Sequence, residues 1–349
     1  MQNFHKLPVK EIIRETRDAV TILFYIPENL KNEFRFISGQ YITIQKIVNG
    51  ELLRRAYSIS SSPKSKEIRV TVKAIKDGKF SVFANTRLKE GDIIDVSIPE
   101  GKFILNTDSK HRKNYLGFAA GSGITPVLSM IKSVLETEKD SKFILVYGNK
   151  SDDQTIFKAK LDELSKSFPN NFEVNYVFSQ KLSDYALSGR INKKIVSEIT
   201  QKRYKELTFD EVFICGPEQM IDTVKGSLID QNITSKNIHF ELFSSSPSKE
   251  NIINPTGTTQ ITFILDEEEK TLEMKKEEVI LNIALKNNLD APYSCQGGIC
   301  SSCLAKIVEG NAVMEKNKIL DKKEIAEGLI LTCQAHPTTS KIVIDFDNV

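Results

Sequence analysis

The chain has 349 residues, enough for two or three domains that each bury a core. Its 48 Lys and Arg residues nearly balance 46 Asp and Glu residues, so the charge of +2 offers no basic footprint for a nucleic acid and no polybasic membrane anchor. No stretch approaches the ~20 apolar residues of a membrane span and the start lacks an export signal, so we expect a cytoplasmic protein that binds a small ligand or another protein.

Residues 1–107 have the pattern of an antiparallel β-barrel. Short apolar runs at 19–26, 40–44, 68–74 and 93–98 are separated by Gly, Pro and Asn-Gly turn signals. We therefore expect an all-β first domain.

A tetrapeptide in this domain is a candidate flavin site. In Arg55-Ala56-Tyr57-Ser58, an Arg can pair with a phosphate, a Tyr ring can lie against the isoalloxazine and a Ser hydroxyl can reach N5. Gly78-Lys79-Phe80-Ser81 follows at a turn, where backbone N–H groups can hold a pyrophosphate. An ordinary half-exposed edge strand is the alternative. The candidate flavin-binding residues are Arg55, Ala56, Tyr57, Ser58, Val72, Ala74, Gly78, Phe80 and Ser81.

Residues 108–244 alternate between strand and helix patterns, which predicts βαβ units on a parallel sheet. Strand 115–119 leads into a helix at 127–135, strand 143–147 into a helix at 155–165, and strand 211–214 into a helix at 218–230.

A glycine-rich run, Gly121-Ser122-Gly123-Ile124-Thr125-Pro126, joins the first of these strands to its helix. Glycines let the backbone approach a pyrophosphate, and a helix N-terminus points N–H dipoles at it. The run departs from the G-x-G-x-x-G fingerprint because Pro126 stands where a later Gly is expected, which disfavours a standard Rossmann site.

The polar, breaker-rich segment 245–257 reads as a linker, and residues 258–349 form a third module. This module opens with a hairpin, 260–265 and 270–274 around an acidic turn, followed by a helix at 280–287.

Four of the five cysteines lie in this module, as Cys295-x4-Cys300-x2-Cys303 followed by Cys333. This is the ligand spacing of a plant-type [2Fe-2S] cluster, and the small residues between the cysteines let backbone N–H groups approach the sulfides. A structural zinc site is the alternative, but zinc usually takes two C-x2-C pairs and only one is present.

These motifs resemble those of known families. Residues 291–303 and 331–335 are similar to the cluster loop and fourth-ligand segment of plant-type ferredoxins, which have a β-grasp fold. The flavin motif, the glycine-rich run, Tyr147-Gly148-Asn149 and Cys215-Gly216-Pro217 are similar to the ferredoxin-NADP reductase family. The order of the three modules resembles the reductase components of multicomponent oxygenases.

The resemblance implies FAD (with FMN as the alternative), a [2Fe-2S] cluster, and NADH or NADPH as cofactors. Hydride would pass from the nicotinamide to the flavin, and single electrons would then pass through the cluster to an acceptor protein, which we expect to be an oxygenase component. Tyr57, Ser58, Cys215 and Glu241 would shape the hydride site, and Phe243 would cover the flavin. A core thiol at Cys215 and a core ring at Phe243 are the alternatives. The candidate dinucleotide residues are Gly121, Ser122, Gly123, Thr125, Pro126, Gly148, Asn149, Ser179, Cys215, Gly216, Pro217 and Met220, and the candidate cluster ligands are Cys295, Cys300, Cys303 and Cys333.

The nucleotide preference rests on one position. The NADPH-preferring members of the family usually carry Ser-Arg where this chain has Ser179-Gln180-Lys181, so NADH is expected to serve at least as well as NADPH. The use of NADPH stays open, because Lys181 and Lys150 are near enough in sequence to hold a 2′-phosphate as point charges. Two other classes remain open at this point: a redox-sensing or electron-transfer subunit without an oxygenase partner, and a binding or transport module that carries zinc.

Overall fold

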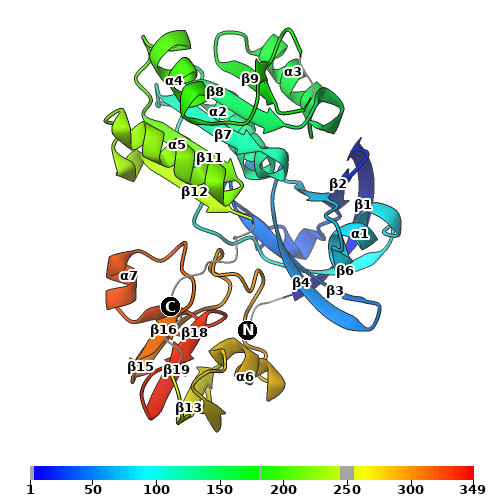
Figure 1. Ribbon diagram of the computed structural model, residues 1–349. Helices are drawn as coiled ribbons and strands as arrows, with labels where there is room; N and C mark the ends of the chain where they lie inside the picture. Colours follow the sequence, from blue (N-terminus) through cyan, green and yellow to red (C-terminus); the bar gives the residue numbers. More distant parts are fainter. Residues whose placement is uncertain (1–3, 181–182, 244–254) are drawn as a thin grey trace. The chain divides into compact units, whose positions relative to one another are not determined.

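The computed structural model describes residues 4–180, 183–243 and 255–349, which divide into two compact units (Figure 1). One unit runs from Phe4 to Phe243 and contains two six-stranded sheets. The other unit contains the remaining described residues and a third, five-stranded sheet. The predicted linker at 245–257 lies almost entirely outside the described residues.

The first sheet is antiparallel and curls into a barrel. Its strand order is β4-β3-β6-β1-β2-β5, and beyond the end of β4 Ile59 forms an antiparallel bridge with Val70 of β5, which joins the two edges. The apolar runs predicted from the sequence supply the buried side chains, such as Ile22, Ile42 and Val96. The elements are β1 (Phe4–Thr16), β2 (Ala19–Phe24), β3 (Tyr41–Val48), β4 (Glu51–Ser58), β5 (Ile68–Lys73), α1 (Lys79–Thr86) and β6 (Ile93–Ser97).

The second sheet is parallel, with the order β10-β9-β8-β7-β11-β12. Helices α2 and α3 cover one face, against Tyr115, Phe143 and Tyr147, while α5 packs on β11 and β12 and against α4. The elements are β7 (Asn114–Ala120), α2 (Ile124–Thr137), β8 (Lys142–Asn149), α3 (Lys158–Ser167), β9 (Phe172–Phe178), β10 (Leu187–Ser188), α4 (Lys193–Ser197), β11 (Glu211–Gly216), α5 (Glu218–Asp230) and β12 (Ile238–Leu242).

The helices of this domain confirm one prediction and correct another. Helix α5 has the predicted bounds, 218–230. The helix expected at 155–165 instead begins at Lys158, after a 3-10 turn at Asp152–Gln154. Phe157 is the cause, because its φ of 61° places it in the left-handed region while its side chain is buried.

Helix α2 joins the two sheets of this unit. The Ser129 hydroxyl donates to the carbonyl of Ser61 at 2.6 Å, and the Lys132 amine donates to the carbonyl of Ser60 at 3.2 Å. These two carbonyls lie just beyond the flavin motif, so the helix that opens at the glycine-rich run also anchors the strand that carries Tyr57 and Ser58.

The third sheet belongs to the C-terminal unit and has the order β14-β13-β19-β15-β17, with β16 and β18 forming a separate pair. The acidic turn, predicted over 266–269, is shorter in the structure, because Glu268 already begins β14 and pairs with Leu265. The turn consists of Asp266 and Glu267, whose positive φ values of 55° and 64° fit a two-residue hairpin. The elements are β13 (Thr258–Leu265), β14 (Glu268–Lys275), α6 (Ile280–Lys286), β15 (Leu304–Glu309), β16 (Ala312–Met314), α7 (Lys322–Ala326), β17 (Leu329–Leu331), β18 (Ala335–Pro337) and β19 (Lys341–Asp345).

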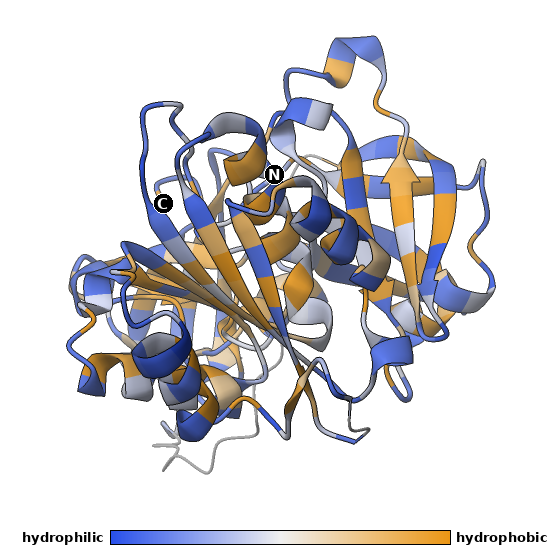
Figure 2. Ribbon diagram, turned by 90° about the horizontal axis from the view of Figure 1, so that it is seen from above, coloured by the Kyte–Doolittle hydropathy of each residue, from blue (hydrophilic) through white to orange (hydrophobic). Residues whose placement is uncertain are grey.

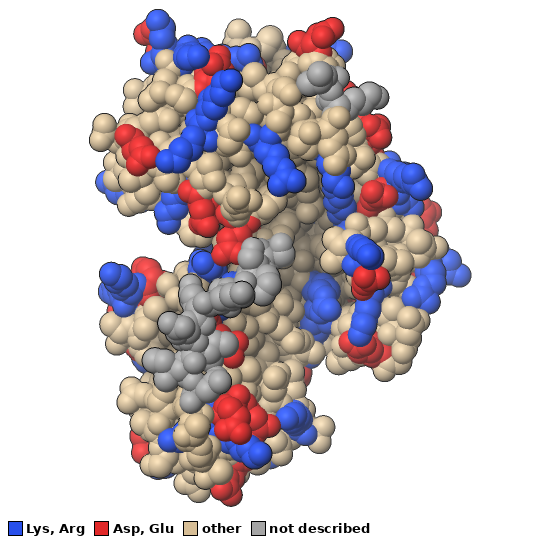
Figure 3. Space-filling model, in the orientation of Figure 1, with Lys and Arg blue, Asp and Glu red and all other residues tan. Residues whose placement is uncertain are grey.

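Hydrophobic residues concentrate on the strands of the sheets (Figure 2). Lys, Arg, Asp and Glu side chains are interspersed over the face of the molecule seen in Figure 3. Among the described residues, no helix combines the length and the apolar character needed to cross a membrane.

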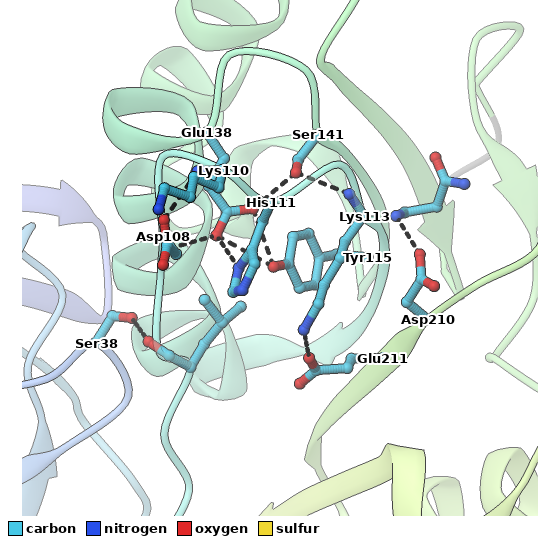
Figure 4. A network of polar contacts seen from close by, with 12 residues as sticks. Ser38, Asp108, Lys110, His111, Lys113, Tyr115, Glu138, Ser141, Asp210 and Glu211 are labelled. Atoms are coloured by element: carbon cyan, nitrogen blue, oxygen red, sulfur yellow. Dashed lines mark hydrogen bonds and ion pairs between the residues drawn. The ribbon is translucent and has the colours of Figure 1, made fainter.

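A buried carboxylate ties the segment that leaves the barrel to the parallel sheet (Figure 4). Glu138, at the end of α2, accepts hydrogen bonds from the Tyr115 hydroxyl at 3.0 Å and the Ser141 hydroxyl at 2.7 Å. It also accepts from the backbone N–H of Asp108 at 3.1 Å, and its Oε1 lies 2.9 Å from Nδ1 of His111. Four groups from three segments therefore share one acceptor side chain.

We predict that Glu138→Ala destabilises this domain by about 3 kcal/mol, because buried hydroxyl donors that lose their acceptor cost about 1–3 kcal/mol each. Urea-dependent hydrogen exchange of the β7 amides measures the loss. Glu163→Ala is the control, since Glu163 pairs with Lys160 on an exposed helix face and its removal changes stability by less than about 0.5 kcal/mol. Equal effects of the two substitutions would contradict the prediction.

Candidate functional site

The glycine-rich run lies where the order of the parallel sheet reverses. From β7 the sheet extends through β8 and β9 on one side and through β11 and β12 on the other. In sheets of this kind, ligands bind at the carboxyl ends of the strands that flank the reversal. Here those ends carry Gly121–Gly123 after β7 and Gly216-Pro217 at the end of β11.

Two of these glycines are required by close packing. A Cβ on Gly123 would stand 2.2 Å from the carbonyl oxygen of Cys215, so only glycine allows the two loops to pass. A Cβ on Gly216 would stand 2.6 Å from the Met220 methyl group and 3.2 Å from Cβ of Ala120. The predicted residue Gly216 therefore lies against the end of β7, and Met220 packs on Gly216.

Helix α2 begins at Ile124, three residues earlier than predicted, directly after a 3-10 turn at Gly121–Gly123. Thr125 and Pro126 thus fall in the first turn, where a proline costs no hydrogen bond. This turn contains no acidic residue, which suits an anion at the helix N-terminus.

A lysine that the sequence reasoning did not single out stands over this loop. Nζ of Lys73, at the end of β5 in the barrel, is 3.8 Å from the position of a Cβ on Gly121. Burial and the nearby charge of Lys150 lower the pKa of Lys73. Lys73 thus brings a cation to the loop, and Lys150 is close enough to act on its charge. Only the position of Lys73 at the end of an apolar strand hinted at this in the sequence.

Asn149 adds a polar group to the same place. Its side chain faces the Tyr147 hydroxyl, but Nδ2 is buried and makes no hydrogen bond within ordinary limits to any described residue. The Tyr147 hydroxyl itself donates to the carbonyl of Gly121 at 2.9 Å. An unsatisfied donor beside two lysines fits a phosphate, whose oxygens are acceptors.

The end of β9 lies next to Asn149 and Lys150. The backbone N–H of Ser179 donates to the carbonyl of Asn149 at 3.0 Å, and that of Gln180 donates to the carbonyl of Lys150 at 2.9 Å. Ser179 is exposed at this edge, while Gly148 is half-buried. Lys181 lies outside the described residues.

The predicted hydride site is assembled from segments distant in sequence. Ser58, at the end of β4, donates from its hydroxyl to Oε2 of Glu241 in β12 at 3.2 Å. Glu241 stands opposite Cys215 in the register between β11 and β12. The structure therefore brings Ser58, Cys215 and Glu241 together.

Burial keeps this cluster uncharged near neutral pH. It raises the pKa of Glu241 to about 8, against a partial lowering by the Ser58 hydrogen bond. It also raises the pKa of the Cys215 thiol, an effect that the nearby Glu241 reinforces. Cys215 is thus a neutral thiol and Glu241 is a proton-bearing carboxyl over most of the physiological range.

The flavin motif lies partly at the surface. Arg55 is exposed, and the Tyr57 ring packs against Phe80 of α1 with ring centroids 5.6 Å apart. Gly78 caps α1, so the predicted turn is the N-terminus of a helix with no acidic residue in its first turn, and Ser81 lies inside that turn. Such an array of N–H groups fits a pyrophosphate.

Three other predicted flavin residues differ in their surroundings. Ala74 is half-buried, whereas Val72 and Phe80 are buried in the barrel core and offer no side-chain surface to a ligand. Phe243 is 39% exposed, so it is not a core residue.

The four cysteines of the C-terminal unit come together. The thiols of Cys300 and Cys333 hydrogen-bond to Cys295, which lowers the pKa of Cys295, and the Cys303 thiol interacts with Cys333. The backbone N–H of Gly297 also donates to Sγ of Cys295 at 3.3 Å. Cys300, Cys303 and Cys333 are buried and Cys295 is half-exposed, so the Cys295 side faces solvent.

The loop around these thiols fits a two-iron cluster. Gln296 and Gly298 have positive φ values of 52° and 69°, which curl the backbone around the sulfurs, and the buried Ser294 hydroxyl has no partner among the described residues. A single zinc ion needs four ligands around one point, whereas four thiolates divide between two irons.

Comparisons with known proteins agree with this layout. An oxidoreductase FAD-binding domain model matches residues 6–104, an oxidoreductase NAD-binding domain model matches 118–226, and a 2Fe-2S iron-sulfur cluster binding domain model matches 263–338. The chain is 37% identical to one of the subunits of 1,2-phenylacetyl-CoA epoxidase from Escherichia coli, over 99% of both chains. It is 31% identical to the ferredoxin reductase component of 3-ketosteroid-9-alpha-monooxygenase from Rhodococcus rhodochrous, over 97% of this chain and 96% of that one. Among solved structures, phthalate dioxygenase reductase has the same fold, with a TM-score of 0.61, 23% identity and coverage of 99% of this chain and 98% of that one.

The raised pKa of Glu241 generates a prediction about stability. Between pH 4.5 and 8 the folded protein holds one more proton at this site than the unfolded chain, so raising the pH costs about 1.4 kcal/mol of stability per unit. In Glu241→Gln this contribution is absent. We expect the variant to match the wild type near pH 5 and to exceed it in stability at pH 8, measured by denaturation of the flavin-loaded protein at both values. Parallel pH profiles would show that Glu241 is ionised in the folded state.

Proposed function

The chain belongs to the ferredoxin-NADP reductase family of flavoproteins that carry a [2Fe-2S] domain, and from this premise we propose that it delivers electrons from NAD(P)H to the oxygenase component of a multicomponent system. Bound FAD accepts hydride as an electron pair and releases electrons singly, which the [2Fe-2S] cluster can carry. The match over 99% of one chain of an epoxidase is the observation that supports this acceptor.

The hydride site that we propose consists of Tyr57, Ser58, Cys215 and Glu241. Ser58 and Glu241 hold one another by a hydrogen bond, and Cys215 is fixed beside Glu241 by the strand register. Ser58 and Cys215 are buried, Tyr57 and Glu241 are half-buried, and the proton on Glu241 keeps a negative charge away from the place where hydride arrives. The residues thus supply orientation and a neutral surface.

The dinucleotide site that we propose lies at the ends of β7, β8 and β11. Gly121, Ser122, Gly123 and Thr125 present backbone N–H groups at the start of α2, and Pro126, which has no N–H, lies in its first turn. Lys73, Lys150 and the unsatisfied amide of Asn149 complete a positively charged rim for the phosphates. The remaining predicted residues of this site, Gly148, Ser179, Gly216, Pro217 and Met220, border the same edge of the sheet.

The flavin site that we propose uses Arg55 and the start of α1 for the phosphates, and Tyr57, Ser58 and Phe243 for the ring. Arg55 is exposed and free to pair with a phosphate through its fork of donors, although it also donates to the carbonyl of Arg54 at 2.7 Å. Cys295, Cys300, Cys303 and Cys333 are the proposed cluster ligands.

The four cysteines provide a test of the electron path. Replacing any one of them with Ser removes a thiolate ligand, so we expect loss of the cluster and of NADH-driven reduction of cytochrome c or of an oxygenase. Reduction of ferricyanide remains largely intact, because a small oxidant takes electrons from the flavin directly. Iron and sulfide analysis beside both assays checks this. Loss of flavin reduction in all four variants would overturn the assignment.

The nucleotide rim yields a prediction about cofactor choice. Gln180 carries no charge to grip a 2′-phosphate, so we expect kcat/KM for NADH to be at least equal to that for NADPH. A preference for NADPH of about a hundredfold, worth about 2.7 kcal/mol, would contradict this.

Lys73→Gln tests whether Lys73 binds the pyrophosphate, because ADP-ribose contains the pyrophosphate and has no 2′-phosphate. We expect it to weaken ADP-ribose binding by about tenfold, or about 1.4 kcal/mol, with the loss shrinking at high salt. Titration calorimetry on the flavin-loaded protein measures this. Lys76→Gln, at an exposed lysine three residues along, is the control and leaves the affinity unchanged.

A further inference from the structure

A buried histidine lies beside the cysteine loop in the C-terminal unit. His336 is 4% exposed, and its Nε2 is 2.8 Å from Oε1 of Glu315. Its other ring nitrogen, Nδ1, is buried with no hydrogen-bond partner among the described residues. Burying a polar ring costs folding free energy unless it is hydrogen-bonded, and here the contact with Glu315 offsets that cost.

The two residues belong to the paired strands β16 and β18, which lie side by side in Figure 1. His336 stands opposite Val313, and Glu315 follows the last residue of β16. His336 is also only three residues beyond Cys333, the proposed fourth ligand. The pair therefore connects the fourth-ligand segment to the chain that follows β16.

That chain, Met314–Lys318, crosses the cysteine loop, and we call it the strap. The backbone N–H of Glu315 donates to the carbonyl of Gln334 at 2.8 Å, and that of Lys318 donates to the carbonyl of Gly298 at 3.1 Å. A Cβ on Gly298 would stand 2.6 Å from the carbonyl oxygen of Lys316, so the strap lies directly on the glycine of the loop.

The fourth-ligand segment also holds the loop. Nε2 of Gln334 donates to the carbonyl of Gln296 at 3.1 Å. The loop between Cys295 and Cys300 is thus held by the strap and by Gln334, and these two segments are fastened to each other by the Glu315 and His336 side chains.

We propose that Glu315 and His336 are positioning residues that clamp the strap over the cysteine loop and thereby set the retention and the reduction potential of the cluster. The inference rests on the proposed ligand set. Groups just outside the ligands fix their geometry, and hydrogen bonding and solvent exposure around the sulfurs tune the potential. Glu315 also places a carboxylate on the strap that lies on the cysteine loop, and a negative charge on this segment would oppose the arrival of an electron at the cluster.

Four variants test the clamp in the full-length, flavin-loaded protein. His336→Ala breaks the contact, whereas His336→Gln retains a donor nitrogen at the same reach. Glu315→Gln retains an acceptor oxygen but removes the charge. Glu309→Gln is the matched control, because it breaks an exposed pair with Lys341 in the same unit. For each, we would measure the rate of iron release to a chelator, the visible circular dichroism of the cluster and its midpoint potential.

We expect His336→Ala to release iron at least about tenfold faster and to alter the dichroism, as loss of an outer-shell partner costs metal sites about 10–100-fold in affinity. His336→Gln, which keeps a donor nitrogen, releases iron at about the slow wild-type rate. Glu315→Gln keeps release near the wild-type rate and raises the potential, and the control changes neither quantity.

The proposal is overturned if His336→Ala retains wild-type release and dichroism, or if Glu309→Gln has the same effects. If His336→Ala yields no soluble protein, then Glu315→Gln with an unchanged potential overturns it instead. Iron and sulfide in the wild-type protein are measured first, because their absence would refute the proposed ligand set rather than the clamp.

Discussion

The packing of helix α2 on the segment that follows β4 is the interaction on which the reductase site depends. The helix opens at the glycine-rich run, and further along it Ser129 and Lys132 donate to the carbonyls of Ser61 and Ser60, respectively. These carbonyls are two and three residues beyond Ser58. A shift of α2 would thus move the dinucleotide loop and the flavin motif relative to each other, and hydride transfer tolerates little misplacement.

Close backbone approach completes the alignment. Gly123 lies so near the carbonyl of Cys215 that no side chain fits between them. This contact places the loop after β7 against the end of β11, and the ladder between β11 and β12 then carries Glu241 to the Ser58 hydroxyl. Ser58, Cys215 and Glu241 thus meet because helix α2 and the ends of β7 and β11 are held in fixed positions.

The centre of the proposed site is uncharged, whereas its rim is positively charged. Burial keeps Cys215 and Glu241 neutral at the centre, while Lys73 and Lys150 bring like charges together at the edge. Asp18 offsets part of the repulsion at Lys73, and the positive charge that the two lysines bring to this place favours a bound anion. In the C-terminal unit the reactive groups are also buried: the thiols of Cys300, Cys303 and Cys333 are buried and that of Cys295 is half-exposed.

The sequence by itself determined the modules and their chemistry. Cysteine spacing, the glycine-rich run and the alternation of strand and helix are local patterns, so they remain legible without coordinates, and the bounds of α5 were predictable for the same reason. The backbone of Phe157 was not, because its left-handed conformation is selected by the burial of its ring and not by its residue type. Lys73 over Gly121, the hydrogen bond between Ser58 and Glu241, and the contact of Glu315 with His336 were decided only by the tertiary structure. Each joins segments that no local pattern relates, and the partner of a polar side chain depends on how whole strands and helices pack.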